Sequence, residues 1–248
     1  MRLLLINPNT TERITDLVAA RAREVAGPGI EIRGATGAFG GRYIACRAAA
    51  AIAAHAALDA LARHHEGCDA VLLACFGDPG LAALKELSPV PVVGMAEAAC
   101  HLACLFGRQF SIVTGGERWA PMLHEFVAGQ GLAARLASIR TLAPTGAEIA
   151  ADPDRALAAL AESCRACAEE DGAEAIILGG AGLAGLAGRI ASGVPVPVIC
   201  SLEAGLRATI AAVGLQATKA AMGSLARTPE LATTGLSGPL AAMLERHR

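Results

Sequence analysis

A cysteine stands at the end of an apolar segment that is typical of a buried strand, where a thiol could remove or donate a proton. The segment is Val-Leu-Leu-Ala-Cys-Phe-Gly at residues 71–77, and its thiol is Cys75. Residues 176–182 repeat the pattern 105 positions later (180 − 75), with Gly180 in place of the cysteine. This repeat predicts two similar half-domains whose equivalent strand ends face one cleft.

The residues after Cys75 favour an ionised thiol. Asp78 has the side chain of a helix N-cap, and Pro79 suits the first position of a helix. A helix start at Pro79 would bring positive backbone partial charge near the sulfur, which stabilises a thiolate. The alternative is a buried structural cysteine, because unpaired cysteines are commonly buried.

Polar groups also follow other predicted strands, and ligands of parallel α/β sheets bind at such carboxyl ends. The segment 7–11 (Asn-Pro-Asn-Thr-Thr) offers the amide of Asn9, although it could equally serve only to cap the next helix. Thr114, with two glycines after it, supplies a hydroxyl and backbone N–H groups at the matching point of the second half. Glu97 and Glu203 each come just after a strand, so they either cap helices or reach the cleft.

Metal-binding and nucleotide-binding motifs are missing from the sequence. Cys164 and Cys167 have CxxC spacing, but their surroundings are helical and no second ligand pair is present, which favours packing within a helix. The six histidines form no HExxH pattern, and the Gly-rich turns match neither a Walker A loop nor the dinucleotide fingerprint. We therefore expect neither a metal nor a cofactor.

Composition excludes several classes of function. A net charge of −2 argues against binding to nucleic acid or to anionic membranes. No run of about 18 apolar residues lacks charges or breakers, and the N-terminus does not have the pattern of a signal peptide. Eight cysteines in a chain of 248 residues suit a reducing compartment better than a disulfide framework, so a cytoplasmic location is expected.

Strand and helix patterns alternate along the chain, which predicts right-handed βαβ units and parallel sheets. Strands are expected at 2–6, 31–34, 71–75, 90–94, 109–114, 137–142, 176–180 and 196–200, and helices at 12–25, 45–65, 79–86, 96–105, 122–129, 152–170 and 202–213, with further helix in the tail from 218 and a break at 233–235. The predicted fold is α/β with two pseudo-symmetric lobes, each a parallel sheet flanked by helices, and an active site in the cleft between them. Residues 1–95 plus 215–248 are expected to form lobe 1, and residues 96–214 lobe 2.

Three segments together resemble the aspartate/glutamate racemase superfamily, and most closely its hydantoin and allantoin racemase branch. They are residues 7–11, 74–81 (Ala-Cys-Phe-Gly-Asp-Pro-Gly-Leu) and 94–98 (Gly-Met-Ala-Glu-Ala). The resemblance implies a cofactor-independent enzyme in which one cysteine from each lobe faces the substrate carbon from opposite sides. Cys75 matches the first of these cysteines, and Gly180 occupies the place of the second. Cys200, at the end of the next strand, is an alternative source of the second thiol.

The resemblance predicts an isomerase that abstracts the proton α to a carbonyl with Cys75, acting on a small cyclic ureide or an amino-acid-like carboxylate. Loss of the second thiol predicts slow inversion, which Gly180→Cys should accelerate. The alternatives are a one-cysteine decarboxylase or other lyase of the same superfamily, and an inactive protein that binds a small ligand. A homo-oligomer is expected. The expected substrate-binding residues are Asn9, Phe76, Gly77, Thr114, Gly180 and Ala181.

Overall fold

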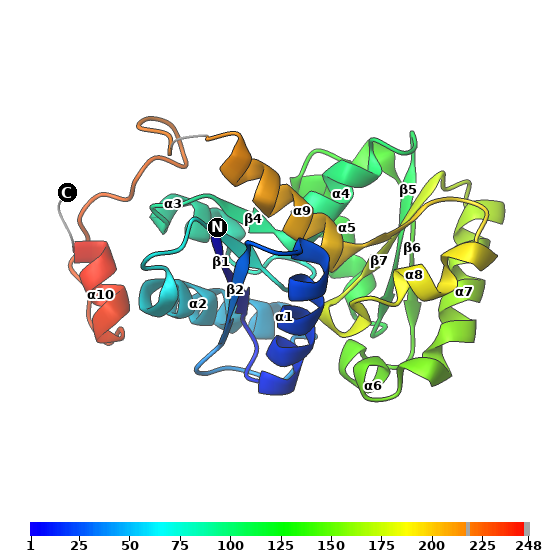
Figure 1. Ribbon diagram of the computed structural model, residues 1–248, viewed down its shortest axis with the longest axis horizontal. Coiled ribbons are helices and arrows are strands. Elements are labelled where there is room, and N and C mark those ends of the chain that lie inside the picture. Colours follow the sequence, from blue (N-terminus) through cyan, green and yellow to red (C-terminus); the bar gives the residue numbers. More distant parts are fainter. Residues whose placement is uncertain (217–218, 246–248) are drawn as a thin grey trace.

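The computed structural model describes residues 1–216 and 219–245, and two four-stranded parallel sheets form its framework (Figure 1). The first sheet has the order β2-β1-β3-β4, with β1 at Arg2–Asn7, β2 at Glu31–Thr36, β3 at Ala70–Leu73 and β4 at Val92–Gly94. The second has the order β6-β5-β7-β8, with β5 at Phe110–Gly115, β6 at Leu136–Leu142, β7 at Ala175–Gly179 and β8 at Val198–Cys200. The expected fold class of two α/β lobes is confirmed.

Helices connect the strands and cover the sheets, as parallel pairing requires. They are α1 (Glu12–Ala26), α2 (Arg47–His64), α3 (Leu81–Leu87), α4 (Met95–Ala103), α5 (Trp119–Gly129), α6 (Gly146–Ala151), α7 (Pro153–Glu169), α8 (Ala187–Ile190), α9 (Ser201–Gly214) and α10 (Gly238–Glu245), with short 3₁₀ turns η1 (Ala133–Arg135), η2 (Ala181–Leu183) and η3 (Ala191–Gly193). Local chemistry accounts for their starts: Thr145 and Glu148 form a capping box at α6, and Asp152 caps α7.

The register of strand pairing reproduces the internal repeat of the sequence. β3 pairs with β1 from Ala70, and β7 pairs with β5 from Ala175, which is the same offset of 105 residues (175 − 70). The next strands, β4 and β8, pair in an equivalent way: Leu73 of β3 pairs with Gly94 of β4, and Leu178 of β7 pairs with Cys200 of β8. The two sheets are therefore equivalent strand by strand, and the ends of β3 and β7 hold matching positions.

Helices α4 and α9 follow the equivalent strands β4 and β8 and pack against each other at the centre of the molecule (Figure 1). Helix α9 also packs against α1 and β3, so it joins the two halves. One hydrophobic core cluster contains Leu72 of the first sheet and Ile112 and Ile177 of the second. The division into residues 1–95 plus 215–248 and residues 96–214 stays a proposal, in which each sheet falls within one range.

Two helical expectations were wrong. The short helix after Cys75 begins at Leu81 rather than Pro79, because the chain first turns through Gly80, whose φ is 78°. The tail is irregular from 219 to 237 and becomes helical only in α10, which packs on α2. Glycines with positive φ at 223 and 235 interrupt the tail, and the expected helix at 217–218 and 246–248 falls outside the described residues.

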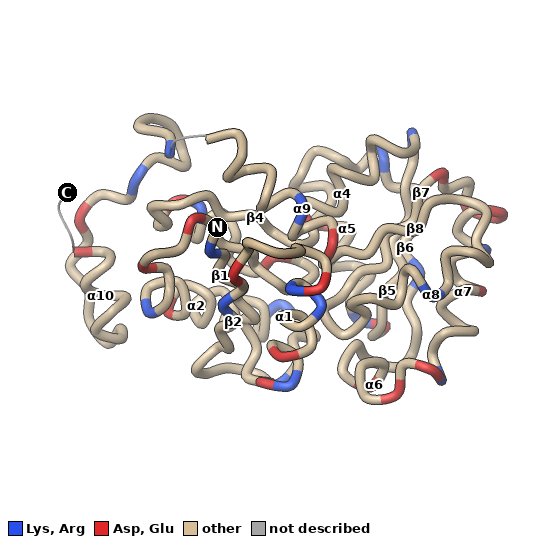
Figure 2. The backbone as a smooth tube through the Cα atoms, in the orientation of Figure 1, with Lys and Arg blue, Asp and Glu red and all other residues tan. Residues whose placement is uncertain are grey.

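Acidic and basic residues are intermixed over both lobes (Figure 2). Salt bridges connect distant elements, including Arg21 of α1 with Glu203 of α9 and Arg47 of α2 with Glu125 of α5. Within the ranges that the structure describes, no helix is long and apolar enough to cross a membrane.

Candidate active site

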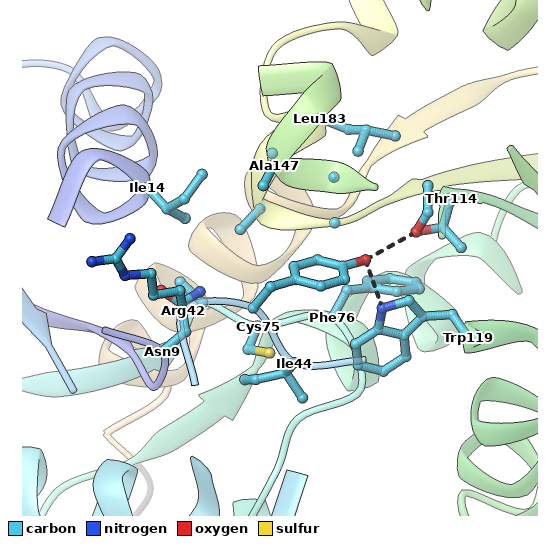
Figure 3. Close-up of a pocket in the computed structure, with 17 residues that line it drawn as sticks. Asn9, Ile14, Arg42, Ile44, Cys75, Phe76, Thr114, Trp119, Ala147 and Leu183 are labelled. Atoms are coloured by element: carbon cyan, nitrogen blue, oxygen red, sulfur yellow. Dashed lines mark hydrogen bonds between the residues drawn. The ribbon is translucent and has the colours of Figure 1, made fainter. Parts of the chain in front are cut away.

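A small cavity of about 60 Å³ lies between the lobes, beside the ends of β3, β5 and β7 (Figure 3). Its walls come from both halves of the chain: Asn9, Ile14, Arg42, Tyr43, Ile44, Ala74, Cys75 and Phe76 from the first, and Thr114, Gly115, Trp119, Gly146, Ala147, Gly180, Ala181, Gly182 and Leu183 from the second. Binding pockets for small molecules usually measure about 300–1,000 Å³. The cavity is therefore narrow for a small-molecule site.

Cys75 lies two residues beyond β3 and lines the cavity, with 8% of its surface exposed. Burial raises the pKa of its thiol well above the usual range, and the nearby carboxylate of Asp78 raises it further. The expectation of a stabilised thiolate was therefore wrong, because burial favours the protonated thiol. The helix start that was expected to ionise it begins six residues later, at Leu81.

Asp78 is buried and caps α4 instead of the helix that follows it. Its carboxylate accepts hydrogen bonds from the backbone N–H groups of Ala96 at 3.0 Å and Glu97 at 2.7 Å. Burial raises the pKa of Asp78 to about 7, although both hydrogen bonds oppose this shift. The backbone at Asp78 has φ 45°, a left-handed conformation that is uncommon for residues other than Gly, Asn and Asp. The residue therefore ties the Cys75 loop to the first turn of α4.

Gly180 faces the same cavity as Cys75 at the equivalent position of the second lobe. Its φ of 130° is readily adopted only by glycine, and its N–H donates to the Ser201 hydroxyl at 3.2 Å. A Cβ atom at this position would lie 3.3 Å from Leu183 Cδ1 and 3.7 Å from Thr114 Oγ1. A side chain at 180 would thus have room toward the cavity but would strain the backbone.

Five of the expected substrate-binding residues line this cavity together: Asn9, Phe76, Thr114, Gly180 and Ala181. Asn9 also has a capping role, because its Oδ1 accepts from the N–H of Thr11 at 2.8 Å. The Phe76 ring crosses to the second lobe and packs on Gly179, where a Cβ atom would collide with it.

Other candidates lie away from the cavity. Gly77 sits under the Trp119 ring, where a Cβ atom would come within 2.7 Å of the indole. Glu97 pairs with Lys85, and Glu203 pairs with Arg21. Cys200 is buried at the end of β8 and is not among the lining residues. Across residues 1–216 and 219–245, no group of three or more His, Cys, Asp or Glu side chains could hold a metal ion.

Sequence reasoning missed Tyr43, Trp119 and Arg42. The Trp119 Nε1–H donates to the Tyr43 hydroxyl at 3.1 Å, and the hydroxyl donates to the Gly115 carbonyl at 3.4 Å (Figure 3). No pattern in the sequence singles these residues out, because Arg42 and Tyr43 lie in an irregular loop. Arg42 is exposed, and among the lining residues that the structure describes it alone carries a charge.

Comparison with known proteins identifies close relatives. The family model described as Asp/Glu/Hydantoin racemase matches residues 3–209. A hydantoin racemase of Paenarthrobacter aurescens is 38% identical over 224 residues, which cover 89% of this chain and 95% of the relative. The crystal structure of allantoin racemase from Pseudomonas fluorescens superposes with a TM-score of 0.91 at 34% identity, covering 95% of this chain and 100% of that one. A mutant of arylmalonate decarboxylase in its liganded form shares the fold, with a TM-score of 0.66 at 20% identity over 87% and 94% of the two chains.

Proposed function

Because the chain belongs to the Asp/Glu/Hydantoin racemase family, we propose that it inverts a carbon next to a carbonyl group in a small cyclic ureide of the hydantoin or allantoin type. The observation that carries this proposal is the position of Cys75 at the wall of the cavity between the lobes. A proton α to the carbonyl of such a ring is acidic enough for a cysteine to remove. No cofactor has a part in the proposed reaction.

Cys75 acts as the base in this proposal. Its thiolate takes the proton from the substrate carbon, and the electron pair of the C–H bond moves onto the carbonyl oxygen. Backbone N–H groups of Phe76 and Ala181 are suited to hold this oxygen, since both residues line the cavity. The amide of Asn9 and the hydroxyl of Thr114 supply further hydrogen bonds to the ring, and Arg42 attracts an anionic ligand to the rim.

Burial favours the protonated thiol, so only the ionised fraction of Cys75 starts the reaction from this side. Water that reaches the sulfur lowers the desolvation cost of the thiolate. A cavity of about 60 Å³ is small for a ring, so we expect it to widen when the substrate enters.

Gly180 supports a second candidate function, a lyase that protonates an enediolate from the Cys75 face only. In this reaction an arylmalonate would lose carbon dioxide, and one thiol would suffice. An inactive protein that binds the same class of ligand is a third candidate, because glycine can carry no proton.

Solvent exchange tests these functions. Each enantiomer of a 5-substituted hydantoin and of allantoin is incubated with the protein in D₂O, and the α-proton signal and the optical rotation are followed together. We expect exchange with inversion, and Cys75→Ala should slow it by about 10²–10⁴-fold. The matched control is Cys104→Ser, which removes a half-exposed thiol that is absent from the cavity lining.

The results separate the candidates. Exchange of both enantiomers that survives Cys75→Ala would overturn the role of the thiol. Carbon dioxide release from an arylmalonate would favour the lyase. A ligand-dependent rise in Tm without any exchange would favour the binding protein, since a ligand at 100 times its Kd adds about 2.7 kcal/mol of stability.

The cellular setting and the assembly are parts of the same proposal. All eight cysteines are unpaired, which supports a cytoplasmic location. Leu105 and Phe106 after α4 and Leu215 after α9 are largely exposed, at 75%, 61% and 78%, which supports a homo-oligomer. Light scattering coupled to size-exclusion chromatography measures the mass, and a monomer at micromolar concentration would contradict this part.

A further inference from the structure

Inversion needs proton-carrying groups on both faces of the substrate carbon, and the second lobe offers no thiol for this. Gly180 stands at the position equivalent to Cys75, and Cys200 does not line the cavity. Two hydroxyl groups do line it, those of Thr114 and Tyr43. An aliphatic hydroxyl is a much weaker acid than a phenol, whose ordinary pKa is about 10.

The Tyr43 side chain crosses from the first lobe to the second. Its backbone belongs to the loop between β2 and α2, and this loop is tied to the start of α1 by the Thr11 hydroxyl, which donates to the Arg42 carbonyl at 2.8 Å. Its hydroxyl, in contrast, bonds to Trp119 of α5 and to the carbonyl of Gly115 at the end of β5. The phenol is thus bonded to the second lobe, while Cys75 follows β3 of the first.

This wall is the one that contains Gly180. β7 pairs with β5 through Gly179 and Thr114, and the Tyr43 hydroxyl contacts Gly115, the next residue along β5. A Cβ atom on Gly180 would approach Thr114 Oγ1, whereas one on Gly116 would lie 2.7 Å from the Tyr43 hydroxyl. The Tyr43 hydroxyl therefore lies at the end of β5, the strand that pairs with β7 just before Gly180, and it is more than 4 Å from a Cβ atom at 180.

The surroundings keep this phenol protonated, because their net effect is to raise its pKa. Burial raises the pKa of Tyr43, while hydrogen bonds from Trp119 and from the Gly146 backbone lower it. Both of these bonds donate to the phenol oxygen, so they also stabilise the phenolate left after proton transfer. Such an oxygen can release a proton to a carbanion and accept one from solvent or from the substrate.

We propose that Tyr43 is the proton-transfer residue on the face of the substrate opposite Cys75, replacing the thiol that Gly180 lacks. This rests on the proposed racemase function. In one direction the Cys75 thiolate takes the α-proton and the electron pair moves to the carbonyl oxygen. The enolate then collapses, its carbon takes the proton from the Tyr43 hydroxyl, and the O–H electron pair stays on the phenolate. The reverse direction starts from the phenolate and ends with the Cys75 thiol as the donor.

Tyr43→Phe tests this role through its stereochemistry in D₂O. Wild-type protein should invert both enantiomers. The variant should lose inversion by about 100-fold or more, yet Cys75 should still exchange, with retention, the enantiomer whose α-proton faces it. The other enantiomer should neither exchange nor invert. A residue that only shaped the site would slow both enantiomers alike, so this asymmetry is the decisive readout.

Thr114→Val is the matched control, because it removes the other hydroxyl of the cavity. The proposal is overturned if Thr114→Val abolishes inversion while Tyr43→Phe does not, or if Tyr43→Phe slows both enantiomers equally. Wild-type protein that exchanges one enantiomer without inverting it would overturn the Tyr43 role and leave Cys75 in place. Wild-type protein that neither exchanges nor inverts would overturn the proposed function as well.

A second measurement tests Tyr43 without a mutation. Because the chain has a single tyrosine, expression with 3-fluorotyrosine modifies residue 43 alone. Fluorine lowers the pKa of a phenol, so the limb of the pH profile of kcat/KM that belongs to Tyr43 should move to lower pH. An unchanged profile in fully fluorinated protein that still inverts its substrate would overturn the proposal.

Discussion

At the scale of single residues, the burial of the Cys75 sulfur controls its reactivity. The thiolate is the form that reacts with alkylating agents, and burial disfavours it here. Iodoacetamide at neutral pH should therefore label the half-exposed Cys46 and Cys104 before Cys75, which reverses the order that a helix start beside the sulfur would give. Mass spectrometry of a partly labelled sample measures the order, with a denatured sample as the control. Preferential labelling of Cys75 would show that the site opens readily without substrate.

A thiol placed at 180 should take over from the phenol. In the Tyr43→Phe background, Gly180→Cys should restore inversion of both enantiomers, because its Sγ would reach the cavity from the same wall. The φ of 130° should make the substitution cost about 1–3 kcal/mol of stability. Gly180→Ala in the same background is the control, since it carries this strain without a thiol. Equal inversion by the Cys and Ala variants would contradict the prediction.

The sequence predicted part of the wall of the site but not the ionisation of its thiol. Cys75, Gly180 and Thr114 were identifiable because strand ends of a parallel sheet meet at one edge. Tyr43 was not, because it lies in an irregular loop whose path depends on contacts with both lobes. The protonation of Cys75 was likewise beyond the sequence, since it depends on burial and on the distance to the next helix.

At the scale of elements, α4 depends on a cap that comes from another segment. The N–H groups of Ala96 and Glu97 lose their acceptor in Asp78→Ala, which should cost about 1–3 kcal/mol. For a chain of this size each 1 kcal/mol corresponds to about 2–4 °C in Tm. Asp78→Asn should cost less, because asparagine keeps an acceptor and tolerates the positive φ. Thermal unfolding of both variants measures the difference, and equal losses would contradict it.

The same carboxyl should make stability depend on pH. Its folded pKa of about 7 lies above the ordinary aspartate value of about 4, so the folded chain holds this proton more tightly than the unfolded chain. Protonation of Asp78 therefore adds to the free energy of unfolding. This contribution is complete below about pH 4 and is lost as the pH rises through about 7. Relative to Asp78→Asn, the wild-type free energy of unfolding should therefore fall over this interval. Urea unfolding at several pH values checks it, and a rising difference would contradict the sign.

Most elements were predictable because the chain alternates buried strands with helices. The exceptions have local causes that a periodicity does not reveal. Helix α3 starts late because the chain must turn through three residues of positive φ, Gly77, Asp78 and Gly80. The tail has helical composition, but Gly223 and Gly235 break it, and only α10 finds a surface to pack on.

At the scale of the whole molecule, the two lobes share one core. The main cluster includes residues of both sheets, and α4 packs on α9 between them. We therefore expect a single cooperative unfolding transition despite the internal repeat. Differential scanning calorimetry should give equal calorimetric and van't Hoff enthalpies. Circular dichroism and tryptophan fluorescence should give the same single Tm. Two separate transitions would show that the lobes unfold independently.

The hydrogen bond between Trp119 and Tyr43 places the chain's only indole at the wall of its cavity. All of the tryptophan fluorescence of this protein therefore originates from a ring that lines the cavity and is hydrogen-bonded to Tyr43. A ligand that enters the cavity must displace the phenol or change the polarity around the ring, and either event alters the emission. The protein is thus its own optical sensor, and unlabelled compounds can be ranked as ligands before any turnover is known.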